Sequence, residues 1–346
     1  MENESQIWTL GELAKTLNAE LIGPEDLVIT VPASSDSDNP SGLAFAEGDE
    51  YLAEAKESGV GAVIVPLTVK DFPKPILRHP NPRMAFGHLL SLFDKPFRAP
   101  IGIHPTAIVD ASAQIDSQAS VGAYVVIERG CHIAKGAAIM PFCYIGENCS
   151  VGENTKIFPH AVLLRDITVG SDCELGPGAI LGHAGFGYYW NGSSQVRVPQ
   201  IGGVIIGNSV DIGALTAIDR ATADATSIND GTKVDNLVQI AHNVKIGKHG
   251  VFASQVGIAG STTIGDRHMA GGQAGYADHV KITDGVMLAG RSGVMGTLSE
   301  PGMYGGAPCM PMRKYRRVTG IIEDLPELLK RVRALEKKVQ ELEGPA

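Results

Sequence analysis

Two histidines in the last third of the chain have the surroundings expected of an acid–base catalyst. His242 lies within a polar stretch, residues 235–247, and His279 follows it 37 residues later. A neutral imidazole near pH 7 accepts a proton readily, which makes histidine the usual general base. We therefore interpret His242 as a candidate base, because the polar residues Asn236, Gln239 and Asn243 flank it. The candidates for binding a substrate beside it are Asp235, Asn236 and Gln239.

Motifs for other kinds of chemistry are missing from the sequence. It contains no phosphate-binding P-loop, no serine nucleophile motif and no cysteine pair at zinc-ligand spacing. Gly185-Phe-Gly-Tyr188 lacks the third glycine of a dinucleotide fingerprint. The sequence thus predicts no metal. A lone histidine in a turn is more often a solvated surface residue, and we expect this of His132, His160, His249 and His268.

A six-residue repeat positions these histidines. From Ile103 to Leu181 an aliphatic residue occupies every sixth position, and the register returns at 206–218 and at 228–294. A period of six is neither helical nor a simple strand alternation, and it is typical of a parallel β-helix. We predict a mainly β fold, a left-handed parallel β-helix of about ten coils. His242 and His279, two 18-residue coils plus one residue apart, then lie along one edge.

The chain is predicted to have three parts. Residues 1–102 show no repeat and instead alternate short helical and strand-like segments, which indicates a small α/β domain. Residues 103–306 form the β-helix. Its register breaks after Leu181, and such interruptions project as loops that often carry function. Residues 307–346 form a helical extension.

The C-terminal extension combines a basic cluster with a heptad pattern. The cluster consists of Arg313, Lys314, Arg316 and Arg317. Apolar residues then follow 3-4 spacing from Leu325 to Leu342. A single short helix of this kind is marginal alone, so its apolar side must pack against something. Together with the flat faces of a β-helix, this favours a homotrimer.

Composition limits the partners and the compartment. The net charge is −9, which does not favour a nucleic-acid partner. The acidic N-terminus lacks the apolar run of a secretory signal, and no stretch is apolar enough for a membrane span. Five cysteines without paired spacing indicate reduced thiols. We expect a cytoplasmic protein.

Several motifs in one order resemble a known family. They are Gly185-Phe-Gly-Tyr188, Pro199-Gln-Ile-Gly202, Thr216-Ala-Ile-Asp-Arg220, Asp235-Asn236, Gln239-Ile-Ala-His-Asn-Val244 and Glu300-Pro-Gly-x-Tyr304. Together they resemble the UDP-3-O-(3-hydroxyacyl)glucosamine N-acyltransferases of the lipid A pathway. The resemblance extends over essentially the whole chain.

The resemblance implies an acyl transfer and assigns roles to residues. A 3-hydroxyacyl chain would pass from acyl carrier protein to the 2-amino group of UDP-3-O-acylglucosamine. His242 corresponds to the catalytic base, His279 to a second active-site histidine and Gly260 to the donor of an oxyanion-binding N–H. Asp235 or a nearby carbonyl would fix the tautomer of His242. No metal or cofactor is implied beyond the 4'-phosphopantetheine arm of the acyl donor.

The same resemblance extends to both ends of the chain. The N-terminal domain is similar to a uridine-binding domain in which Phe45 and Tyr51 stack on the uracil ring. Gly48 and Glu50 replace an Asn and a Lys common between those aromatics. The basic cluster, residues 313–317, suits the acidic acyl carrier protein. Near the base of the acyl channel, Gly293 stands where the family often has Met, whereas Met295 is kept.

Alternative functions make different demands on the sequence. The O-acyltransferase that acts on UDP-GlcNAc shares the solenoid and a catalytic histidine but lacks the N-terminal domain. A coenzyme A-dependent sugar N-acyltransferase is a weaker rival. A γ-type carbonic anhydrase needs three zinc-binding histidines, two of them separated by four residues. A structural or ice-binding solenoid needs repeated threonine arrays, which this sequence does not show.

Overall fold

The computed structural model describes residues 7–95 and 99–343, and the chain separates into two compact units, Met1–Arg98 and Ala99–Ala346. In the first unit a five-stranded sheet has the order β2-β7-β6-β5-β4, with β7 antiparallel to β2 and the other pairs parallel. The bounds of its elements are β1 (Trp8–Thr9), α1 (Leu10–Thr16), β2 (Glu20–Ile22), β3 (Val28–Ile29), β4 (Val31–Pro32), β5 (Gly42–Phe45), α2 (Asp49–Glu57), β6 (Ala62–Pro66), β7 (Ile76–His79) and α3 (Pro82–Phe93).

Local sequence signals explain the first unit. Thr9 caps α1 in a reciprocal capping box with Glu12, as the spacing of these two residues predicts. Asn81 caps α3, and Pro82 occupies its first turn, where a missing N–H costs nothing. The apolar faces of α1 and α3 bury Leu13 and Leu89 against the central strands.

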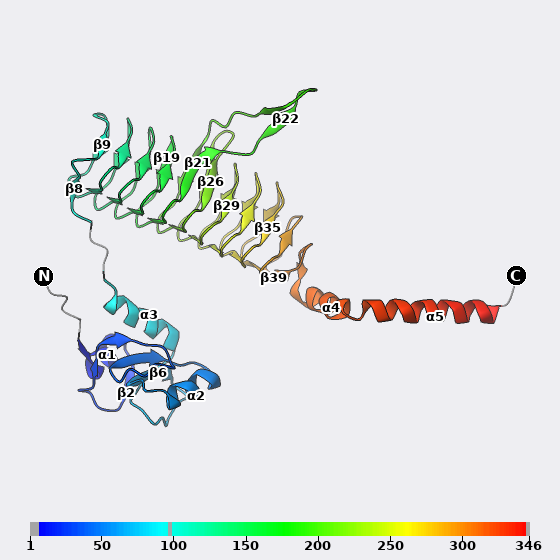
Figure 1. Ribbon diagram of the computed structural model, residues 1–346, viewed down its shortest axis with the longest axis horizontal. Coiled ribbons are helices and arrows are strands. Elements are labelled where there is room, and N and C mark those ends of the chain that lie inside the picture. Colours follow the sequence, from blue (N-terminus) through cyan, green and yellow to red (C-terminus); the bar gives the residue numbers. More distant parts are fainter. Residues whose placement is uncertain (1–6, 96–98, 344–346) are drawn as a thin grey trace. The chain divides into compact units, whose positions relative to one another are not determined.

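The second unit is the predicted β-helix, with three sheets as its faces, all of whose strands pair in parallel except β40 at the end of the twelve-stranded sheet (Figure 1). The three sheets contain nine, ten and twelve strands. The number of coils therefore depends on which face is counted and differs slightly from the predicted ten. The ten-stranded sheet, called here the groove sheet, consists of β9 (Ile108–Val109), β12 (Val126–Ile127), β15 (Tyr144–Ile145), β18 (Val162–Leu163), β21 (Ile180–Ala184), β26 (Ala217–Arg220), β29 (Gln239–Ile240), β32 (Gly257–Ile258), β35 (Gly275–Tyr276) and β38 (Gly293–Val294).

The other two faces complete each coil. The nine-stranded sheet contains β10 (Gln114–Ile115), β13 (His132–Ile133), β16 (Ser150–Val151), β19 (Ile167–Val169), β24 (Gly203–Ile206), β27 (Ala225–Ile228), β30 (Lys245–Ile246), β33 (Thr263–Ile264) and β36 (Lys281–Ile282). The twelve-stranded sheet contains β8 (Gly102–Ile103), β11 (Ser120–Val121), β14 (Ala138–Ile139), β17 (Lys156–Ile157), β20 (Glu174–Leu175), β25 (Asp211–Ile212), β28 (Lys233–Val234), β31 (Val251–Phe252), β34 (Met269–Ala270), β37 (Val286–Leu288), β39 (Gly302–Gly305) and β40 (Met310–Pro311).

The six-residue period determines which side chains fill the solenoid. The repeated aliphatic residues, such as Ile133, Ile240 and Ile258, point inward and are buried in one continuous core. Ile103 is an exception at 51% exposed, because its strand begins the solenoid and is covered on one side only. Corner residues such as Asn148 and Asp166 adopt positive φ, a conformation that Asn and Asp tolerate better than most residues.

The two expected departures from the repeat are present. After β21 the chain leaves the prism as an antiparallel hairpin of β22 (Tyr188–Trp190) and β23 (Gln195–Arg197), which projects outward in Figure 1. At the other end, α4 (Met312–Ile322) and α5 (Leu325–Glu343) follow the last strand. None of the helices in the described part of the chain is both long and apolar enough to cross a membrane.

Candidate active site

A groove of about 740 Å³ runs along the edge where the groove sheet meets the nine-stranded sheet. Its walls come from successive coils and from the root of the hairpin. The lining residues include both candidate histidines and are His183, Ala184, Phe186, Arg197, Asp219, Gln239, Ala241, His242, Gly257, Ile258, Ala259, Gly260, Gly275, Tyr276, Asp278 and His279.

The side chain of Asn243 fixes the tautomer of His242. Asn243 Oδ1 lies 2.9 Å from His242 Nδ1 and also accepts from the backbone N–H of Thr222 at 3.1 Å. Because an amide oxygen only accepts, the imidazole proton is on Nδ1 and the lone pair of Nε2 is free. This arrangement agrees with the expectation that a nearby carbonyl orients the ring, whereas Asp235 makes no contact with it.

Two glycines, one before and one after His242 in the sequence, lie so close to its side chain that neither position has room for a Cβ atom. A Cβ atom on Gly260, one coil later, would lie 2.8 Å from His242 Nε2. A Cβ on Gly185, at the start of the hairpin, would lie 2.6 Å from His242 Cβ. Within the described residues, the Gly260 N–H has no hydrogen-bond acceptor. A free N–H beside the candidate base is the arrangement that an oxyanion requires.

The structure also brings His279 and Gln239 to the groove. His279 occupies a corner with φ of 57°, and its backbone N–H donates to the Gly260 carbonyl at 3.0 Å. This bond links the two coils that carry Gly260 and His279. Gln239 is on the outward side of β29 and donates to Asp219 at 3.1 Å.

Asp235 and Asn236 lie elsewhere, at the corner between the twelve-stranded sheet and the groove sheet, and do not line the groove. Asn236 Oδ1 accepts from the backbone N–H of Ala214 at 2.6 Å, and Asp235 Oδ1 accepts from Asn236 N at 2.7 Å. Within one chain, the side chains of Asp235 and Asn236 therefore stabilise turns through these hydrogen bonds.

Two groove residues were missed at the sequence level. Asp219 is buried in the groove wall, where burial raises the pKa of its carboxyl group. His183 lies opposite it on β21, with Nδ1 3.9 Å from Asp219 Oδ1. The sequence did contain a signal that could have placed Asp219 in the groove. Asp219 follows the inward residue Ile218, just as Ala241 follows the inward residue Ile240 directly before His242.

The expectation for His268 was wrong. Its side chain is 0% exposed and lies inside the solenoid, with Nε2 2.6 Å from the Tyr276 hydroxyl oxygen. It follows the inward Ile264 by four residues, a position that small buried residues such as Val244 and Thr262 occupy in other coils. Burial lowers the pKa of His268 to about 4. His132, His160 and His249 are exposed, as predicted.

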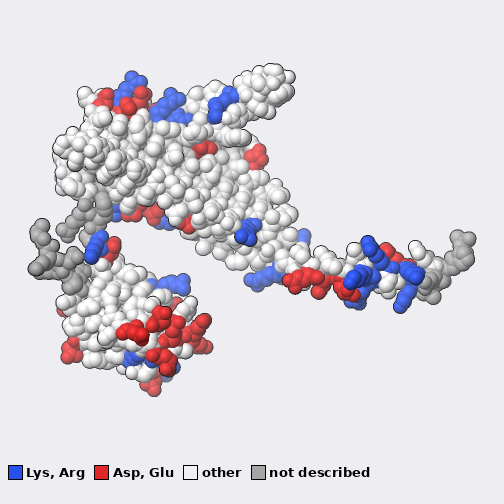
Figure 2. Space-filling view, in the orientation of Figure 1, with Lys and Arg blue, Asp and Glu red and all other residues white. Residues whose placement is uncertain are grey.

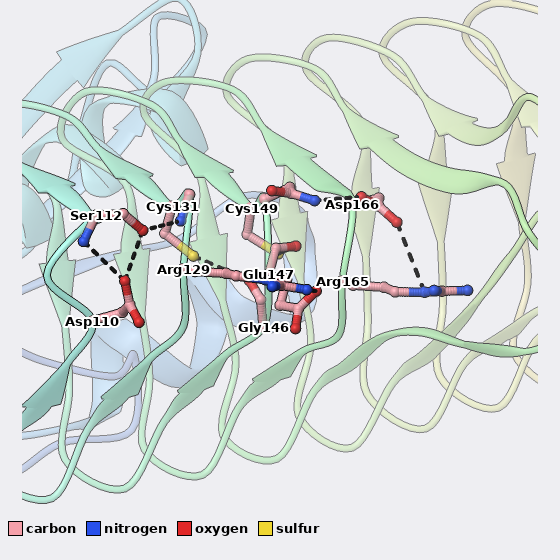
Figure 3. A network of polar contacts seen from close by, with 11 residues as sticks. Asp110, Ser112, Arg129, Cys131, Gly146, Glu147, Cys149, Arg165 and Asp166 are labelled. Atoms are coloured by element: carbon pink, nitrogen blue, oxygen red, sulfur yellow. Dashed lines mark hydrogen bonds and ion pairs between the residues drawn. The ribbon is translucent and has the colours of Figure 1, made fainter.

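The corner column that holds His242 and Gly260 has a different character in earlier coils. There it contains Arg129, Glu147 and Arg165, each two residues after an inward aliphatic residue (Figure 3). Arg129 pairs with Glu147 at 3.0 Å between solvated side chains. Along this column the surface ion pairs are therefore replaced by His242 and Gly260 where the groove begins.

The first unit has a cavity of its own, of about 460 Å³. Phe45 and Tyr51, the predicted stacking pair, both line it, together with Arg83 and Phe86. The ring centroids of Phe45 and Phe86 are 4.8 Å apart. Gly48 precedes α2 with φ of 93°, and Glu50 is not part of the cavity lining.

The predicted basic cluster lies on α4, where all four side chains are exposed. Arg313, Lys314 and Arg317 line a shallow pocket with Val318 and Ile321, whereas Arg316 does not contribute to it. Figure 2 shows blue and red side chains along the C-terminal helices and little charge over much of the visible solenoid surface. Among the described residues, no three His, Cys, Asp or Glu side chains form a metal-binding group.

Comparisons with known proteins agree with this arrangement. Residues 124–157 and 149–183 match the family model of the bacterial transferase hexapeptide (six repeats). A solved UDP-N-acetylglucosamine acyltransferase from Arabidopsis covers 62% of this chain and 76% of its own, with a TM-score of 0.56 and 24% identity, which shows a shared fold.

Curated relatives match the chain over a greater length. A UDP-3-O-acylglucosamine N-acyltransferase of Geobacter sp. (strain M21) is 49% identical over 97% of this chain and 97% of its own length. One from Pseudomonas paraeruginosa is 40% identical over 96% of this chain and 95% of its own. Because these relatives match both compact units and the repeat, the chain belongs to the UDP-3-O-acylglucosamine N-acyltransferase family and is an acyltransferase.

Proposed function

We propose that this protein transfers a 3-hydroxyacyl chain from acyl carrier protein to the 2-amino group of UDP-3-O-(3-hydroxyacyl)glucosamine. The product is the UDP-2,3-diacylglucosamine. The observation that carries the proposal is that His242, with a free Nε2, lies against Gly260, whose N–H is unbonded among the described residues, inside a groove. The family relationship supplies the class of acceptor.

His242 is the general base in this reaction. The neutral amine attacks the thioester carbon, and Nε2 of His242 takes the proton that the nitrogen loses as the C–N bond forms. The C–S bond then breaks, and the same proton passes from His242 to the departing pantetheine thiolate. Asn243 keeps Nδ1 protonated throughout, so the ring always presents Nε2 to the substrate.

Gly260 stabilises the tetrahedral intermediate. Its N–H donates to the oxygen that becomes negative when the amine adds, and the lack of a side chain lets the thioester approach. His279, one coil further along, orients the substrate across the groove. No step requires a metal or a cofactor beyond the phosphopantetheine of the donor.

Glycines on the groove sheet make room for the acyl chain. Gly257 and Gly275 occupy equivalent outward positions in consecutive coils, and a Cβ on either would meet no atom within 4 Å. Gly293 continues this row, with Ala307 and Met295 beside it. The three glycines form a row without side chains that extends from the base toward the end of the solenoid.

The remaining parts of the chain bind the remaining parts of the substrates. Phe45 and Tyr51 hold the uracil ring in the cavity of the first unit. Arg313, Lys314, Arg316 and Arg317 attract the acidic acyl carrier protein, which resides in the cytoplasm. Asp235, Asn236 and Gln239 contact the nucleotide sugar.

The enzyme works as a homotrimer. In the N-terminal coils the outward residues of the groove sheet are apolar, with Ile108 68% exposed in the single chain. The apolar side of α5 is also exposed, including Leu325, Leu335 and Val339. Both surfaces would be buried if three solenoids packed through these faces and three tails met.

The test is an assay of the purified protein with UDP-3-O-acylglucosamine and 3-hydroxyacyl carrier proteins of graded chain length. We expect turnover with at least one length. His242→Ala should reduce it by about 10²- to 10⁴-fold, the contribution of a general base. His132→Ala, an exposed histidine on another face, is the matched control and should retain full activity. No turnover with any length contradicts the proposal.

A further inference from the structure

The groove contains a buried carboxylate that the proposed reaction does not yet use. Asp219 is only 7% exposed, yet it lines the open groove. Its strand β26 pairs with β29 through Ile218 and Ile240, which places Asp219 beside Ala241, the residue before His242. The carboxylate therefore lies one coil away from the proposed base.

The protein supplies this carboxylate with little positive charge. Asp219 Oδ2 accepts from Gln239 Nε2 at 3.1 Å, and the nearest ionisable partner is His183, 3.9 Å away. No lysine or arginine among the described residues forms an ion pair with it. The adjacent Arg220 is turned away and donates to the carbonyls of Gly182 and Arg165.

The other charged groups of the groove are already engaged or exposed. The guanidinium of Arg197 stacks on the Tyr188 ring and donates to its hydroxyl. Asp278, the second carboxylate of the lining, is exposed to solvent. A desolvated carboxylate is costly without a cation, so a cationic group on the ligand would be held strongly at Asp219 and only weakly at Asp278.

We propose that Asp219 binds the protonated 2-amino group of the acyl acceptor and thereby selects an amine over a hydroxyl. This inference rests on the proposed function. The acceptor amine arrives as an ammonium ion, and its ion pair with Asp219 places the nitrogen beside His242. One proton leaves to solvent before attack, and the second is taken by His242 and given to the thiolate. The product nitrogen is a neutral amide, so the ion pair is lost on turnover and the product is released.

The test compares the affinities of substrate and product by calorimetry on the full-length protein. Asp219→Asn keeps an oxygen for Gln239 but removes the charge. It should weaken binding of UDP-3-O-acylglucosamine at least about tenfold, as expected for a charged hydrogen bond. Binding of UDP-2,3-diacylglucosamine, whose 2-nitrogen is a neutral amide, should change less than about twofold. Asp278→Asn is the matched comparison and should weaken substrate binding less than about twofold, because this exposed carboxylate of the same groove is solvated.

The possible results separate this inference from the proposed function. Equal weakening of substrate and product by Asp219→Asn would mean that Asp219 only maintains the groove, and no change in either would mean that it does not meet the amine. Either result overturns the inference while wild-type turnover still supports the function. If wild-type protein neither binds nor acylates the substrate, both fail. Should Asp219→Asn not fold, Asp219→Ser is measured in the same way.

Discussion

At the scale of single residues, the geometry around His242 depends on neighbours that lack a side chain or a charge. Two glycines contact the ring, and one asparagine oxygen holds its Nδ1 proton. Thr222 in turn holds that oxygen and donates to Gln200 at the end of the hairpin. The orientation of the base is therefore set by small and neutral groups, without a carboxylate partner.

Gly260→Ala should disable the enzyme without unfolding it. The new Cβ would lie 2.7 Å from His242 Cε1 and 2.8 Å from Nε2, so the ring must move. A displacement of about 1 Å at a catalytic group typically costs about 10²-fold in rate. We expect such a loss in kcat with an unchanged melting temperature. The matched control is Gly257→Ala, assayed with the shortest accepted donor, since its Cβ meets no atom. Equal loss in both variants would contradict the steric explanation.

The repeat predicts that His242 and His279 lie along one edge, and both line the groove. Gly260, assigned from the family resemblance, lines it as well, while the catalytic roles of all three stay predictions. Asp219 and His183 were not assigned, since their burial and pairing depend on where the chain leaves and re-enters the prism. The prediction for His268 was wrong because the residue type alone does not tell a buried histidine from a solvated one in a turn. Its position four residues after the inward Ile264 is the feature that distinguishes it.

At the scale of elements, the hairpin depends on a buried arginine at its base. Arg220 is 4% exposed and bonds the carbonyls of Gly182 and Arg165 at 2.7 and 2.6 Å, joining three coils next to the point where the hairpin leaves. This anchoring role could not be read from the sequence, because the two carbonyls are 38 and 55 residues away.

Arg220→Lys should therefore destabilise the solenoid and loosen the groove wall. A lysine cannot reproduce the planar, two-directional donation, and losing one charged hydrogen bond costs about 2 kcal/mol. Denaturant unfolding measures the loss, and activity should fall with it. Arg129→Lys, whose ion pair with Glu147 is solvated, is the control and should cost less than about 1 kcal/mol. Equal effects would show that burial of Arg220 is not decisive.

At the scale of the whole molecule, the buried His268–Tyr276 pair makes stability depend on pH. The pKa of His268 is lowered to about 4 from 6.5, so between these values the unfolded chain binds more protons than the folded one. Stability is therefore lost as the pH falls from 6.5 toward 4. The full contribution of such a shift is about 3 kcal/mol.

His268→Gln should flatten this acid dependence. Glutamine can still bond the Tyr276 hydroxyl but does not titrate, so the difference between variant and wild type isolates the histidine. The measurement is the unfolding free energy from pH 7 to 4 at fixed protein concentration, because the stability of the proposed trimer would depend on concentration. An unchanged acid slope would contradict the assignment. His132→Gln, on the surface, should behave as wild type.

The register of the coils also determines how the length of this enzyme can vary among its relatives. Strand partners along each face are mostly 18 residues apart, as in Gln239 with Gly257 and Gly257 with Gly275. Removing or duplicating a whole coil before the hairpin would leave every offset in the groove intact. A change of six residues would rotate everything after it onto a different face. Inherited insertions and deletions in the prism should therefore come as whole coils or as loops at the corners.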